Sequence, residues 1–214
     1  MPNSKVFLLT RPRHDALMRY FFAWSDPLVA MASSKGFNVC DLHDGKANKA
    51  LLESYIAKNC PSLILFNGHG TTDTIHGDQD KVIVDADSKC RRSIVYARSC
   101  SCGERLGHDL VKGGARTFIG YRRDFYCGCS YEHLVDPKKD KLAARFLGPS
   151  NLIISTLLKG GTAEEAYQRS VGAMHKNFME MISSRADYKE RYAARYLLSN
   201  MAHQVLLGDA LAMA

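Results

Sequence analysis

No stretch of this sequence is apolar over the roughly 18 residues that a membrane span needs. The first fifteen residues, MPNSKVFLLTRPRHD, also lack the long apolar core and the small-residue cleavage site of a signal peptide. Neither a membrane anchor nor an export signal is therefore predicted. We expect a cytoplasmic protein with no membrane partner.

The sequence also lacks a disulfide pattern, internal repeats and low-complexity tracts. Its seven cysteines are an odd number and are scattered along the chain, so reduced thiols are expected in a protein without an export signal. The 214 residues, of which 46% are hydrophobic and 24% charged, suit one globular domain over residues 1–214.

Acidic residues are too few to balance the basic ones, and the formal net charge is +7. This charge favours an acidic partner, either nucleic acid or an acidic protein. The basic residues are spread along the chain, however, without a basic tail or a basic stripe interleaved with aromatic residues. A solvated basic surface is the simpler interpretation, and nucleic-acid binding is an alternative that the sequence does not favour.

Strand-like and helix-like segments alternate over the first 121 residues. Strands are predicted over residues 5–10, 36–42, 62–66, 93–97 and 115–121. Helices are predicted over residues 14–34, 48–58 and 104–112, and a hairpin over 74–77 and 81–85. Alternation with short connections predicts an α/β fold, a three-layer α/β/α sandwich with a mostly parallel central sheet.

The pattern changes after the predicted sheet core of residues 5–121. Residues 122–150 are rich in Tyr, Cys, Gly, Lys and Pro and are predicted to form a long loop, which is typical of a functional or mobile segment. C-terminal helices are predicted over residues 151–159, 162–182 and 188–206, and Thr162 with Glu165 forms a capping box at the start of the second one.

Two of the predicted strands end in reactive side chains. One runs into Asn67-Gly-His-Gly70, and the next strand of the main sheet runs into Ala97-Arg-Ser-Cys-Ser-Cys-Gly103. Ligands of open α/β sheets bind beyond the carboxyl ends of the strands. If these two strands pair, His69 and a cysteine lie side by side, and a histidine next to a thiol is suited to acyl transfer.

These segments, together with Gly113-Gly-Ala-Arg-Thr-Phe-Ile-Gly-Tyr121, resemble the caspase-like cysteine peptidases, the group of caspases, metacaspases, legumains, gingipains, separases and CHAT domains. The CHAT branch looks nearest, because its members follow the cysteine block with a similar Gly-Ala-apolar-Gly strand. The resemblance covers roughly residues 60 to 170. It implies a cysteine endopeptidase that needs no cofactor and acts on a protein or peptide substrate.

The resemblance also assigns roles to single residues. His69 matches the family's catalytic base, Cys100 its nucleophile, and the N–H groups of Gly70 and Cys100 its oxyanion hole. Cys100 matches better than Cys102, because Gly103 then occupies the family's glycine position three residues after the nucleophile.

Arg98, two residues before Cys100, matches the position that lines the pocket for the substrate residue preceding the scissile bond. The loop after the first strand often supplies a second wall, and here it carries Arg11 and Arg13. Converging arginines favour an acidic substrate residue. Asp124 is also expected at the substrate site, where it either pairs with an arginine or serves as a site of self-cleavage, the latter role being shared with Asp140.

Two alternatives stay open. Cys100, Cys102, Cys127 and Cys129, with His69, His108 or His133, could hold zinc, although a one-residue gap between cysteines is poorer than the usual two to four. The chain could also be an inactive adaptor that binds nucleic acid or an acidic protein. For the peptidase, the resemblance further allows gating by a partner protein or by processing, and a homodimer.

Overall fold

The structure is a computed structural model that describes residues 5–214. Its centre is a six-stranded sheet with the order β2-β1-β3-β6-β7-β8, in which the first five strands are parallel and β8 is antiparallel. The strands are β1 Val6–Thr10, β2 Asn38–Leu42, β3 Leu63–Asn67, β6 Ile94–Arg98, β7 Thr117–Tyr121 and β8 Gln204–Gly208. The predicted mostly parallel sheet is confirmed.

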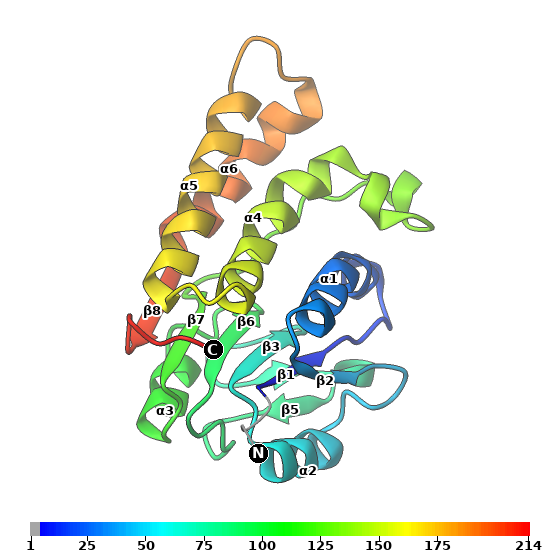
Figure 1. The fold of residues 1–214 in the computed structure, drawn as a ribbon. Coiled ribbons are helices and arrows are strands. Elements are labelled where there is room, and N and C mark those ends of the chain that lie inside the picture. Colours follow the sequence, from blue (N-terminus) through cyan, green and yellow to red (C-terminus); the bar gives the residue numbers. More distant parts are fainter. Residues whose placement is uncertain (1–4) are drawn as a thin grey trace.

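Helices cover both faces of this sheet (Figure 1). They are α1 Ala16–Ser34, α2 Lys49–Asn59, α3 Leu106–Lys112, α4 Lys141–Leu158, α5 Ala163–Met181 and α6 Tyr188–His203. Side chains of α1, α4 and the start of α5 pack on one face, and those of α2, α3 and a hairpin of β4 (Ile75–His76) and β5 (Val82–Val84) pack on the other. The predicted three-layer sandwich and the predicted hairpin are therefore confirmed.

The central strands β1, β3, β6 and β7 are buried along their whole length. In β1, Phe7 and Leu9 face the α1 and α4 side, whereas Val6 and Leu8 face the α2 and α3 side. Apolar residues on both faces are what parallel strands between two helical layers require. This explains why these segments are nearly continuous apolar runs in the sequence.

A smaller cluster of buried side chains joins α4, α5 and α6 to one another. In Figure 1 these three helices extend well beyond the edge of the sheet, with the connection between α5 and α6 at the far end. Within residues 5–214, no helix has both the length and the apolar character that crossing a membrane requires.

The loop predicted over residues 122–150 is shorter in the structure, because α4 begins at Lys141 rather than at residue 151. Asp140 caps it by accepting hydrogen bonds from the N–H groups of Leu142 and Ala143. Pro149 lies inside the helix and cannot donate to the carbonyl of Arg145. The Asn177 side chain donates to that carbonyl instead, at 2.8 Å, which removes part of the usual cost of an internal proline.

The last predicted helix, residues 188–206, is also too long. α6 ends at His203, and Gln204–Gly208 forms β8, which pairs with β7 from Thr117 to Tyr121. The predicted helix includes Gln204 to Leu206, which lie in β8 in the structure. The pairing of β8 with the exposed side of β7 satisfies backbone groups that a sheet edge leaves free, and only the tertiary structure provides that edge.

Candidate active site

The two strands that end in reactive side chains are neighbours. β3 pairs with β6 in parallel, in a register that sets Asn67 opposite Arg98. His69 and Cys100 each follow this last pair by two residues. The sheet therefore delivers the imidazole and the thiol to the same edge, at its carboxyl end.

The glycines on either side of His69 are required by close packing. A side-chain carbon added at Gly70 would lie 2.7 Å from the Cys100 carbonyl oxygen and 2.9 Å from the Ser99 Cβ. A carbon added at Gly68 would overlap the His76 carbonyl. Gly70 thus lets the chain that carries His69 lie directly against the peptide of Cys100, and Gly68 lets it lie against the hairpin at His76.

His69 has a partner that the sequence analysis missed. Its Nε2 atom lies 2.7 Å from Oδ2 of Asp15, in the segment between β1 and α1. The other carboxylate oxygen, Oδ1, caps α1 by accepting from the Met18 N–H. Burial alone would raise the pKa of Asp15, but the bonds from Met18 and His69 outweigh it, and the pKa is lowered. The signal in the sequence was the capping position before α1, which fixes this carboxylate.

Cys100 lies in the turn that follows β6 and is half-buried. Burial raises the pKa of its thiol, an effect that a backbone hydrogen bond from Phe125 opposes and that the nearby Asp124 carboxylate reinforces. The next residue, Ser101, has φ of 56°, a left-handed conformation that few side chains adopt. The thiol is therefore presented at a tight turn and is mostly protonated at neutral pH.

Cys102 lies in a different environment. It is fully buried in the core on the face of the sheet that α2 and α3 cover, and it contacts the Ser99 carbonyl. Burial raises the pKa of its thiol to about 12. Gly103, one residue on, packs against the Tyr121 backbone, where an added carbon would lie 2.9 Å from the carbonyl oxygen. Of the two cysteines in this turn, Cys100 is the one that a substrate can reach.

Arg98 is completely buried, although it is an arginine. Its guanidinium donates to Ser150 Oγ at 2.8 Å and to Asn151 Oδ1 at 2.5 Å, and it lies over the Phe21 ring. Both acceptors are neutral, and the third nitrogen, Nη1, has no hydrogen-bond partner within residues 5–214. Arg98 thus holds a buried positive charge and an unused donor close to Cys100 in sequence.

Arg11 and Arg13 do not supply the free cations that the sequence predicted. Arg11 is buried, donates to Asp26 and Asp41, and stacks on the Phe22 ring. Two carboxylates neutralise its charge, so the expectation that Arg11 binds substrate was wrong. Arg13 is exposed and pairs with Asp44, a partner that the sequence did not suggest.

Asp124 and Asp140, the two candidate self-cleavage positions, differ in exposure. Asp124 is exposed and accepts from Ser101 Oγ at 3.3 Å, next to the candidate nucleophile. Asp140 is 2% exposed and accepts from Tyr20, Ser130 and two N–H groups of α4. Asp140 is held too firmly to enter an active site, so the structure corrects that expectation and keeps Asp124 as a neighbour of Cys100.

The cysteines do not gather into a metal site. Among the residues that the structure describes, one group has metal-ligating atoms within 4.8 Å of one another, and it consists of His14, His69 and Asp80. It contains neither Cys100 and Cys102 nor Cys127 and Cys129. The zinc alternative built on the cysteine pairs therefore has no support in the geometry.

The fold has counterparts among solved structures of peptidases. The Arg-specific cysteine proteinase gingipain R superposes with a TM-score of 0.64 at 10% identity, over 98% of this chain and 47% of that one. The complex of Porphyromonas gingivalis RgpB pro- and mature domains gives 0.62 at 8% identity, over 98% and 48%. The Saccharomyces cerevisiae separase in its complex with securin gives 0.55 at 13% identity, over 96% and 12%.

These similarities show that the chain has the fold of the caspase-like cysteine peptidases, as predicted. The chain spans about half the length of the gingipain structures. No protein family model and no curated protein sequence matches the chain. The nearness to the CHAT branch stays a prediction.

The different environments of Cys100 and Cys102 predict different reactivity. In the folded protein at pH 8, iodoacetamide should alkylate Cys100 at least about 100-fold faster than Cys102, whose thiol is buried and has a pKa of about 12. The Cys100 rate should rise with pH, since the raised pKa leaves little thiolate at neutrality. Peptide mass spectrometry measures both rates, and in urea the two should converge. Equal reaction of both cysteines in the native state would contradict this assignment.

Proposed function

We propose that this chain is a cysteine endopeptidase in which His69 and Cys100 form a catalytic dyad. The observation that carries the proposal is the register of β3 and β6, which sends both residues to one edge and packs Gly70 on the Cys100 peptide. The fold shared with gingipain R and separase supports the same reaction class.

Asp15 gives the histidine a defined tautomer. A carboxylate can only accept a hydrogen bond, so the 2.7 Å contact requires a proton on Nε2 of His69. In the neutral ring, Nδ1 then carries the lone pair and can accept a proton. Asp15 is thus the positioning residue of a Cys-His-Asp arrangement, the same logic by which an aspartate orients the histidine of serine peptidases.

The reaction follows from these groups. Since burial keeps the Cys100 thiol protonated, His69 removes the proton as the sulfur attacks the peptide carbonyl. A carbon–sulfur bond forms, the carbonyl oxygen becomes negative, and the tetrahedral intermediate then expels the amine, which takes the proton from His69. Water releases the peptide acid from the thioester by the same steps, and the thiol is regenerated.

The N–H groups of Gly70 and Cys100 can stabilise the negative oxygen. Neither N–H donates a hydrogen bond to any residue in the range 5–214, although the neighbouring Thr71 and Ser101 N–H groups both do so. Two unused donors on peptides that pack against each other are what an oxyanion hole requires. No cofactor has a role in these steps.

Arg98 supports a preference for an acidic residue before the scissile bond. Leaving a buried ion without a counter-charge costs several kcal/mol, and the neutral groups of Ser150 and Asn151 do not supply that charge. A substrate carboxylate would supply it at the unused Nη1 atom, which is buried in this structure, once the side chains that cover this atom move aside. Arg13, with its exposed guanidinium, is the second candidate for this contact.

Regulation belongs to the proposal as well. The neighbouring structures include one complex with a pro-domain and one with securin, so control by a protein partner is consistent with the fold. Asp124, exposed beside Cys100, is the candidate for self-cleavage. A homodimer through a sheet edge is part of the same hypothesis, with β2 and β8 as the edge strands.

Replacement of each cysteine by alanine tests the proposed dyad. Cys100→Ala should lower kcat/KM on a peptide library by at least about 1,000-fold, because the nucleophile is lost. Cys102→Ala should retain activity within a few fold and cost about 1 kcal/mol or less of stability, since it deletes one small buried atom. Turnover and urea denaturation are measured on both variants. Loss of turnover with Cys102→Ala and not with Cys100→Ala would overturn the assignment.

Asp15→Asn tests the positioning role, because Asn caps a helix as well as Asp does and the change leaves α1 intact. We expect kcat to fall about 10- to 100-fold with little change in KM or thermal stability, since the amide no longer fixes the His69 tautomer. The control is Asp44→Asn, which alters an exposed partner of Arg13. Equal losses in the two variants would speak against a role of Asp15 in positioning His69.

A peptide panel tests the acidic preference. Peptides with Asp or Glu before the scissile bond should be cleaved about 10- to 100-fold more efficiently than their Asn or Gln counterparts, the range of a charge-assisted hydrogen bond. Arg98→Met should remove this difference, and Arg13→Gln shows whether the exposed arginine contributes. Best cleavage after Arg or Lys would refute the preference while leaving the peptidase reaction in place.

A further inference from the structure

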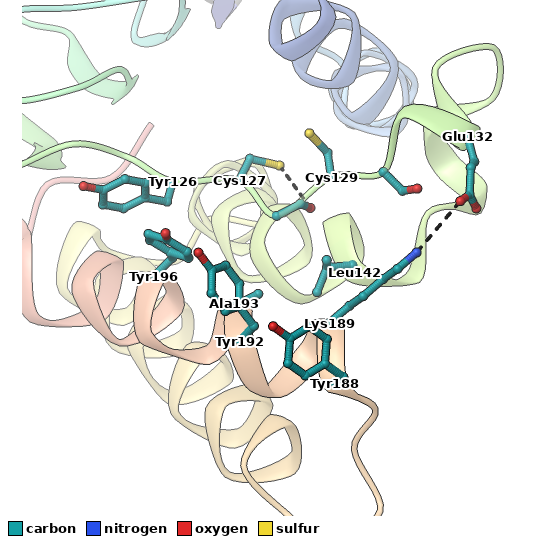
Figure 2. A pocket seen from close by; sticks show the side chains of 12 residues that line it. Tyr126, Cys127, Cys129, Glu132, Leu142, Tyr188, Lys189, Tyr192, Ala193 and Tyr196 are labelled. Atoms are coloured by element: carbon teal, nitrogen blue, oxygen red, sulfur yellow. Dashed lines mark hydrogen bonds and ion pairs between the residues drawn. The ribbon is translucent and has the colours of Figure 1, made fainter.

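A cavity lies along the segment that follows Phe125, whose carbonyl contacts Cys100. It has a volume of about 770 Å³ and opens between the segment that follows β7 and one face of α6 (Figure 2). Four of its lining residues are tyrosines, and the side chains of Leu142 and Ala193 add further apolar surface. The tyrosines are Tyr126, Tyr188, Tyr192 and Tyr196.

The four tyrosine rings form a continuous row. Tyr188, Tyr192 and Tyr196 are spaced four residues apart and share one face of α6, and their ring centroids are 6.3 and 6.1 Å apart. Tyr126 continues the row at 4.9 Å from Tyr196. Tyr188 is 74% exposed and Tyr192 51%. A contiguous row of exposed aromatic rings is typical of a surface that binds a ligand or another protein.

The wall opposite α6 offers free backbone groups. Asn200, which is buried, holds the Tyr126 peptide by accepting from its N–H at 2.9 Å and donating to its carbonyl at 2.7 Å. Beyond this anchor, the N–H groups of Cys127, Gly128 and Cys129 donate no hydrogen bond to any described residue. Free donors beside an aromatic row suit a peptide, whose main chain pairs with the backbone while its side chains enter the pocket.

The cavity is continuous with the active site along the chain. The Phe125 carbonyl contacts the Cys100 sulfur at 3.9 Å, and Tyr126, the first residue of the cavity, follows directly. If a substrate peptide pairs in extended conformation with the segment from Phe125 to Cys129, its scissile bond lies near Phe125, where the Cys100 sulfur is. The peptide residues opposite Cys127 to Cys129 are then two to four positions away from that bond.

The charges around the cavity disfavour a cationic side chain. Arg195 already stacks on Tyr192 at 4.1 Å and on Tyr196 at 4.7 Å. Lys189, at the other end of the cavity, pairs with Glu132 at 3.8 Å (Figure 2). A cationic side chain of the substrate would meet two positive charges, Arg195 and Lys189, and only one negative charge, Glu132. An uncharged aromatic ring gains from stacking on tyrosine without that repulsion.

We infer that this tyrosine pocket binds a large apolar or aromatic side chain of the substrate peptide, two to four residues from the scissile bond. The inference rests on the proposed function and deepens it, because it adds a second determinant of specificity to the residue that Arg98 selects. Tyr188 and Tyr192 are the most exposed tyrosines of the pocket, and Tyr126 follows Phe125, whose carbonyl contacts Cys100.

The test uses the whole chain and fluorescein-labelled peptides with a central Asp in one set and a central Arg in a second set, each carrying Tyr or Ala at each of the four positions on either side. Turnover is measured with the wild type, and binding by fluorescence anisotropy with Cys100→Ala. The same measurements are repeated after Tyr188→Ala with Tyr192→Ala. The control is Leu198→Ala, an exposed apolar residue of α6 outside the cavity. Thermal unfolding checks that each variant is folded.

We expect a preference of about tenfold or more for Tyr over Ala at one position, reduced to about twofold or less by the two tyrosine changes and unaffected by Leu198→Ala. Cleavage without such a preference, or a preference that the tyrosine variants retain, overturns the inference and leaves the peptidase function standing. Tyrosine-dependent binding without cleavage by the wild type overturns the function and supports the pocket. Neither cleavage nor tyrosine-dependent binding overturns both.

Discussion

The candidate site depends on the close contact between two backbone segments, Gly68 to Gly70 after β3 and Ser99 to Cys100 after β6. The parallel register brings these segments to one edge, and the absence of a side chain at Gly70 lets them touch, while Gly68 packs against the His76 carbonyl of the hairpin. The same contact sets two unused N–H groups side by side and carries His69 to the edge where Cys100 lies. Packing and proposed catalysis therefore both require a residue without a side chain at position 70.

The two buried arginines, Arg11 and Arg98, lie in different electrostatic environments. Arg11 is buried against two carboxylates, which compensate its desolvation. Arg98 is buried at least as deeply, yet it meets only neutral acceptors and an aromatic ring. An uncompensated buried charge costs several kcal/mol, and this cost is the physical basis of the proposed preference for an acidic substrate residue.

The helices α4, α5 and α6 extend the site beyond the sheet. Their own small core, together with the bonds between Asn200 and Tyr126, attaches the segment after β7 to α6. As a result, the chain that leaves the sheet next to Cys100 runs directly into the tyrosine pocket. The sheet thus carries the candidate dyad, and the helical extension carries the pocket proposed to bind a side chain of the substrate peptide.

The sequence by itself determined the α/β sandwich and the two strand ends that carry His69 and Cys100 with the glycines near them, whereas the structure showed that these two strands pair. These follow from local patterns, namely apolar runs of strand length, helical spacing and turn residues, and from one family resemblance. The predicted start of α4 was wrong, because Gly148 and Pro149 are typical of a helix boundary. In the structure the helix continues through them, and the Asn177 side chain donates a hydrogen bond to the Arg145 carbonyl that Pro149 leaves without a donor. Only the tertiary structure decided that Asp15 contacts His69, that Asp26 and Asp41 neutralise Arg11, that Gln204–Gly208 pairs with β7, and that four tyrosines form one pocket. Each of these depends on contacts between residues far apart in the chain, which no local period or spacing encodes.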